Sequence, residues 1–140
     1  MTEGGRPSLG DVWRYPFLWS REAAQGETEG RKARPVAMIL LQRNVAGEIE
    51  CLMVPITSRP PRDGAFALPV PEIEKRRAGL DVHLALWVVT DEANIDVPER
   101  SFYFEPGGRL GAFSIHFTKS VQAQMIQALR ARKLTRTSRR

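Results

Sequence analysis

The chain has 140 residues, a single cysteine and a formal charge of +5 at pH 7. This length suits one domain that buries a core without covalent staples, and a lone cysteine excludes an internal disulfide. The first residues lack the apolar stretch of a signal peptide, and no apolar run approaches the roughly 20 residues that cross a bilayer. We therefore expect a cytoplasmic protein with no membrane segment.

The positive charge is concentrated at the C-terminal end. Residues 130–140 hold six arginine or lysine residues and no acid, so the formal charge of +5 becomes −1 over the first 129 residues. Such an end either attracts nucleic acid regardless of its sequence or is only a solvated terminus. We divide the chain into a disordered lead at 1–9, one domain at 10–133 and a basic tail at 134–140.

The first half of the domain predicts three strands and a long loop. Residues 11–17 alternate aromatic with other side chains, which is typical of a strand. Residues 20–33 are charged, contain two glycines and lack an apolar period, which predicts a mobile loop. Residues 34–42 and 48–57 are apolar strands joined by a short turn, so we expect them to pair as a hairpin.

The second half predicts shorter elements. We expect a strand at 65–70, one or two helical turns at 71–79 and a buried strand at 83–89. A loop is expected at 90–94, and the aromatic segment at 101–104 predicts a further short strand.

The last predicted element is an amphipathic helix. Thr118 is a suitable N-cap, and apolar residues follow it at helical spacing: Val121, Met125, Ile126 and Leu129. Many short strands before one helix predict a mainly β fold, a small and strongly curved sheet or barrel with a C-terminal α-helix. The chain has no glycine-rich phosphate loop, no paired-cysteine zinc pattern and no nucleophile elbow.

The predicted hairpin brings a cation and two hydroxyl groups to one end of the sheet. Arg34 opens the first strand, and Thr57 and Ser58 end the second. Asp91 follows a later strand and is expected close to them. Each residue alone is more often a surface charge, a turn or a cap. Together, fixed positive charge and hydroxyl donors favour a site for phosphate chemistry.

Three short motifs, in this order, resemble the PemK/MazF family of bacterial toxins. They are Gly10-Asp11-Val12-Trp13, a glycine- and glutamate-containing loop that ends in Arg34-Pro35, and Val54-Pro55-Ile56-Thr57-Ser58. The match covers residues 10 to about 70 and continues more loosely to the final helix. The resemblance implies an SH3-like small β-barrel with a C-terminal helix, a fold similar to that of the gyrase poison CcdB, and a homodimer.

The resemblance also implies an activity. Members of the family are toxins of type II toxin–antitoxin systems that act as metal-independent endoribonucleases on mRNA and are neutralised by a cognate antitoxin. Arg34 matches the arginine that contacts the scissile phosphate, Thr57 matches the hydroxyl residue of its motif, and Asp91 resembles an aspartate after a later strand. We expect these three residues to be catalytic, with neither metal nor cofactor. The residues expected to contact single-stranded RNA are Ser58, Glu29, Arg31, Arg59 and Arg62.

Two other interpretations stay open. Catalytic members carry an arginine two residues before that aspartate, where this chain has Val89. Such a chain could be a non-catalytic nucleic-acid-binding or regulatory relative on the same fold, with RNA on its basic loops and stacked on Trp13 or Trp19. The third interpretation is a protein-binding inhibitor similar to CcdB.

Overall fold

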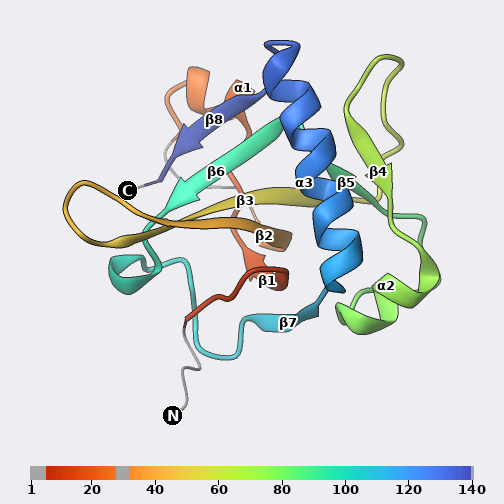
Figure 1. Ribbon diagram of the computed structural model, residues 1–140, viewed down its shortest axis with the longest axis horizontal. Coiled ribbons are helices and arrows are strands. Elements are labelled where there is room, and N and C mark those ends of the chain that lie inside the picture. The colour runs from red at the N-terminus through yellow and green to blue at the C-terminus, as the bar shows by residue number, and fades with distance from the viewer. Residues whose placement is uncertain (1–5, 28–31, 140) are drawn as a thin grey trace.

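The computed structural model describes residues 6–27 and 32–139 (Figure 1). Within these residues the protein is a mainly antiparallel β-sheet with three α-helices. The helices are α1 (Ser20–Ala24), α2 (Glu72–Arg77) and α3 (Ile115–Arg130), with a 3-10 turn η1 (Pro98–Arg100). The strands are β1 (Asp11–Tyr15), β2 (Arg34–Arg43), β3 (Ile49–Thr57), β4 (Ala67–Pro69), β5 (Trp87–Val89), β6 (Glu92–Asp96), β7 (Arg109–Ala112) and β8 (Thr135–Ser138).

The strands follow the order β4-β5-β3-β2-β1-β7, and β6 adds a branch between β3 and β8. β3 is shared, because β5 pairs with its C-terminal end and β6 pairs with its N-terminal half. Within the described residues, β4, β7 and β8 each pair with one neighbour, so the sheet does not close. The predicted mainly β fold with a C-terminal helix is confirmed at this level. The closed barrel is not.

The predicted hairpin is formed by β2 and β3. Its antiparallel ladder pairs Val36 with Pro55 and Met38 with Met53, and it continues to the turn. The register shifts by one residue between Met38 and Leu40, which makes Ile39 a β-bulge. The Ile39 carbonyl accepts a hydrogen bond of 2.9 Å from the Gln122 side chain on α3. This bond ties the helix to the irregular point of the sheet.

Each face of the sheet has its own core. The cluster under α3 is mostly aliphatic and includes Val54, Ile56 and Val88. The opposite cluster is aromatic and includes Trp13, Tyr15 and Phe104. Because successive strand side chains point to opposite faces, this division tells which face each residue of β2 and β3 occupies. α3 crosses the first face diagonally (Figure 1).

A buried carboxylate connects the two longer helices. The N-cap of α3 is Ser114, whose side chain accepts a 3.1 Å hydrogen bond from the Phe117 backbone N–H. Glu74 on α2 accepts hydrogen bonds from the Ser114 backbone N–H at 2.9 Å and from its hydroxyl at 2.7 Å. The predicted start of this helix at Thr118 was therefore wrong, because Ser114 provides a cap one turn earlier.

Several other local predictions were wrong. Residues 20–33 were expected to be entirely loop, but α1 occupies their start. The strand expected at 83–89 covers only Trp87–Val89, and β6 begins at Glu92, inside the expected loop. Residues 101–104 form turns and not a strand. Phe102 is 95% exposed, while Phe104 packs into the aromatic cluster. The aromatic composition of residues 101–104 reflects the packing of single side chains and not the pairing of a strand.

The described part of the segment expected as a basic tail contributes β8, which runs parallel to β6. Arg139 follows this strand and anchors it to the rest of the fold. Its Nη1 donates to the Pro16 carbonyl at 2.8 Å and to Asn94 Oδ1 at 3.1 Å. Its guanidinium also lies over the rings of Tyr15 and Tyr103, at 5.4 and 4.3 Å from their centroids. None of the helices described is long and apolar enough to span a bilayer.

We predict that Arg139→Ala lowers the free energy of unfolding by about 1–3 kcal/mol, because it removes charged hydrogen bonds and cation–π contacts. Arg136→Ala is the matched control, since Arg136 is an exposed arginine of the same strand and its loss should cost less than about 0.5 kcal/mol. Urea denaturation of both variants measures the difference. Equal effects would contradict the anchoring role of Arg139.

Candidate functional site

Arg34 and Thr57 lie at the same end of the β2–β3 hairpin. The ladder pairs Val36 with Pro55, so continuing the antiparallel register by two residues sets Arg34 opposite Thr57. Both side chains fall on the aromatic face, because Val36 and Met53 belong to the aromatic cluster and strand side chains alternate. The sequence prediction that these two residues share an end of the sheet agrees with this register.

The Arg34 guanidinium is half-buried against α1. It lies 5.4 Å from the ring centroid of Trp19. Burial lowers the pKa of Arg34 below its ordinary value. The charge of Glu22 opposes this change, and the charges of Arg21 and Arg59 add to it. Its Nε is buried and has no hydrogen-bond partner within the described ranges. A buried guanidinium donor of this kind can bind an acceptor that is not among the described residues.

Two side chains of β6 fix α1 and the residues just before it, which include Trp19. Glu92 accepts hydrogen bonds from the backbone N–H of Ser20 at 3.0 Å and from its hydroxyl at 2.7 Å. Asn94 accepts from the Leu18 N–H at 2.9 Å and donates to the Leu18 carbonyl at 2.8 Å. The Trp19 backbone N–H in turn donates a hydrogen bond of 3.1 Å to the Glu22 carboxylate, as in a capping box. Trp19 and Glu22 are thereby held beside Arg34.

The segment after β3 combines a hydroxyl with exposed cations. Thr57 Oγ1 accepts a 3.1 Å hydrogen bond from the Arg59 backbone N–H, so its hydroxyl hydrogen remains a donor. Ser58, Arg59 and Arg62 are exposed in the loop that follows. The charge of Arg59 helps to lower the pKa of Arg34, as expected for a loop that lies near the start of β2.

Asp91 lies in a different environment from the one expected. It sits between β5 and β6, and the interactions that act on its carboxyl group come from the Phe66 backbone and from Lys133. Among the described residues, the carboxylate whose charge acts on Arg34 is that of Glu22. Glu29 and Arg31, the remaining predicted substrate-binding residues, lie outside the described residues.

The three tryptophans differ in what they offer a ligand. Trp13 is fully buried, so it cannot stack on RNA. Trp19 is half-buried between aromatic and cationic neighbours. Trp87 is half-buried and pairs with Thr57 across β3 and β5, which sets it on the aromatic face beside the hydroxyl. Its position depends on the β3–β5 pairing, which the sequence pattern did not contain.

The residues that sequence analysis missed are Arg21, Glu22 and Trp87. The segment of α1 was taken as loop because its apolar residues have no period. The Trp19-Ser20-Arg21-Glu22 order is a weak capping-box signal, with glutamate three residues after the N-cap position. That signal could have indicated a helix at this point.

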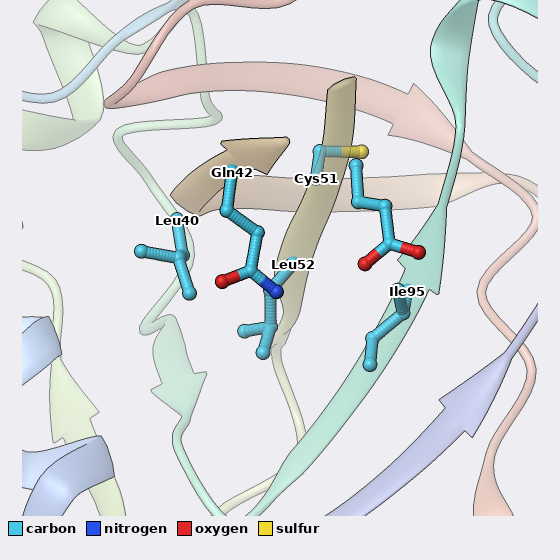
Figure 2. A pocket seen from close by; sticks show the side chains of 6 residues that line it. Leu40, Gln42, Cys51, Leu52 and Ile95 are labelled. Carbon is cyan, nitrogen blue, oxygen red and sulfur yellow. The ribbon is translucent and has the colours of Figure 1, made fainter. Parts of the chain in front are cut away.

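A separate small pocket lies between β2, β3 and β6 (Figure 2). Its lining includes Leu40, Gln42, Cys51 and Ile95. Burial raises the pKa of the Cys51 thiol to about 12, so the sulfur stays protonated and is a poor nucleophile. The part of the chain that the structure describes also has no group of three or more histidine, cysteine, aspartate or glutamate residues that could hold a metal. Neither this pocket nor a metal site among the described residues is therefore a stronger candidate for the functional site than the surroundings of Arg34.

Comparison with known proteins adds no family assignment. No protein-family model matches the chain, and no curated protein matches it. The PemK/MazF resemblance therefore rests on the three short motifs and stays a prediction.

We predict that the difference in free energy of unfolding between Asp91→Asn and wild type is more favourable to the variant at pH 7 than in acid. Burial raises the pKa of Asp91 above its ordinary value of 3.8, so the folded protein binds a proton there more readily than the unfolded chain. The carboxyl group therefore stabilises the fold below pH 3.8, and this contribution is lost as the pH rises through the folded pKa. Urea unfolding of both proteins on either side of that range measures the change. A difference independent of pH would contradict this environment for Asp91.

Proposed function

We propose that this protein is a PemK/MazF-like toxin, a metal-independent endoribonuclease whose active site lies at the open end of the β2–β3 hairpin. The observation that carries the proposal is the β2–β3 ladder, which ends with the pair of Val36 and Pro55, so that Arg34 and Thr57 each lie two residues beyond it at the same end of the hairpin. In this proposal the open sheet is a variant of the SH3-like barrel. The proposed partners are a cognate antitoxin and a second copy of the chain.

The proposed chemistry uses the RNA 2′-hydroxyl as the nucleophile against the adjacent phosphate. The unpartnered Nε of Arg34 and the hydroxyl of Thr57 bind the phosphate oxygens and stabilise the charge that develops on them. A lowered pKa makes Arg34 a better proton donor than an ordinary arginine, which suits protonation of the leaving 5′ oxygen. Asp91 is the base that the family resemblance implies, and the groups that act on its carboxyl are the Phe66 backbone and Lys133.

Single-stranded RNA is the proposed substrate. Arg59 and Arg62 extend the positive charge from Arg34 along the exposed loop after β3, where they would contact the RNA backbone. Trp87, beside Thr57, offers a ring on which an unpaired base can stack. Single-stranded RNA carries both of the groups that these side chains recognise, phosphates and unstacked bases.

One observation favours a second function, RNA binding without cleavage. Val89 occupies the position of the family's second arginine and pairs with Ala67 in β4. The charge that acts on the Asp91 carboxyl is that of Lys133. The charges that act on Arg34 are those of Glu22, Arg21 and Arg59. A site with phosphate-binding cations but no aligned base would bind RNA and leave it intact.

We predict that Arg34→Ala slows cleavage of single-stranded RNA by about 10²–10⁴-fold and that Thr57→Val slows it by about 10²–10³-fold. The assay measures single-turnover cleavage of a labelled RNA in the presence of a chelator. Arg77→Ala is the control, because Arg77 is exposed at the C-terminal end of α2 and lies outside the basic C-terminal end of the chain, and it should cleave at the wild-type rate.

Three outcomes separate the proposals. Cleavage that is lost in both site variants and kept in the control supports the nuclease. Cleavage that persists in all variants contradicts it and points to a contaminating enzyme. Wild-type protein that binds RNA in a salt-dependent way without cutting it supports the second function.

A further inference from the structure

Arg21 and Arg34 share one aromatic ring. The Arg21 guanidinium carbon lies 5.1 Å from the Trp19 ring centroid, and that of Arg34 lies 5.4 Å from it. The two arginines come from α1 and β2, which the chain connects through a long segment. Trp19 therefore gathers two cations that the sequence pattern gives no reason to associate.

This arrangement has an electrostatic cost in the absence of a ligand. The charge of Arg21 lowers the pKa of Arg34, as expected for two cations held near each other. Trp19 and Glu22 each offset part of the repulsion, because each guanidinium is attracted to the ring and the charge of Glu22 raises the pKa of Arg34. A phosphodiester between the two cations would offset the rest, and guanidinium groups match phosphate oxygens in geometry.

We propose that Arg21 is the second phosphate-binding cation of the site and forms, with Arg34, a two-arginine clamp organised by Trp19 for an RNA phosphodiester. This inference rests on the proposed function and adds a residue to it. The clamp supplies the positive charge that Val89 does not. It draws on α1 in place of β5, and α1 is fixed to the sheet by Glu92 and Asn94.

The exposure of the two arginines suits a division of labour. Arg34 is half-buried with an unpartnered Nε, so it is preorganised and desolvated. Arg21 is exposed on the first turn of α1, so it can close on a phosphate that has already met Arg34. Arg59 also acts electrostatically on Arg34, but its side chain has no aromatic support in the described contacts. We assign it to the RNA backbone outside the clamp.

The test compares wild type, Arg21→Ala, Arg21→Lys and the control Arg77→Ala. Binding is measured with a 2′-O-methyl RNA oligonucleotide, which lacks the nucleophile and cannot be cut, over a series of salt concentrations. Cleavage is measured separately with the matching unmodified RNA. Thermal unfolding followed by circular dichroism checks that every variant folds, which we expect because Arg21 is exposed.

For Arg21→Ala we expect binding at least about tenfold weaker and a salt slope smaller by about 0.7, the value for one phosphate contact on a single strand. Single-turnover cleavage should fall by about 10²–10³-fold. Arg21→Lys should keep the salt slope while losing part of the affinity and rate, since an ammonium ion cannot reproduce the planar fork. Arg77→Ala should match wild type in all measurements.

The outcomes distinguish the clamp from the proposed nuclease. If Arg21→Ala binds and cleaves as wild type does while Arg34→Ala fails, the clamp is overturned and the nuclease stands. If wild type binds the modified RNA but cuts nothing, the nuclease is overturned, and weaker binding by Arg21→Ala still supports the clamp. If wild type binds no RNA, both are overturned.

Discussion

The antiparallel register between β2 and β3 determines where the proposed site lies. Its last pair is Val36 with Pro55, so Arg34 and Thr57 each lie two residues beyond it, and side-chain alternation turns both toward the aromatic face. A slip of one residue would move every side chain of a strand to the other face. The bulge at Ile39 does shift the ladder, but it lies on the turn side of Met38 and leaves the register at the Arg34 end intact.

Polar side chains of β6 connect this register to the rest of the fold. Glu92 and Asn94 bind the backbone before and at the start of α1, and Asn94 also accepts from Arg139. Asp96 accepts a 2.8 Å hydrogen bond from the hydroxyl of Tyr15, the β1 residue that pairs with Arg34. One short strand thus positions α1, the end of β1 and the C-terminal strand. Buried polar groups are stable in such a strand because each finds a partner.

The sequence predicted what depends on apolar periodicity and failed where single polar contacts decide. The β2–β3 hairpin and the final helix have long apolar patterns, and both were predicted. Residues 92–96 carry polar side chains whose partners are distant in sequence, so β6 was taken for a loop. Arg34 and Thr57 could be grouped from the hairpin alone. Grouping Arg21 with them required knowing that Trp19 docks beside β2.

A double-mutant cycle on Arg34 and Thr57 tests most directly whether the two residues serve one phosphate. The measured quantity is the affinity of wild type, Arg34→Ala, Thr57→Val and the double variant for 2′-O-methyl RNA. The account predicts a coupling free energy within about 0.5–3 kcal/mol, with the double variant little weaker than the worse single variant. Effects that simply add would contradict a shared site, because independent residues contribute independently.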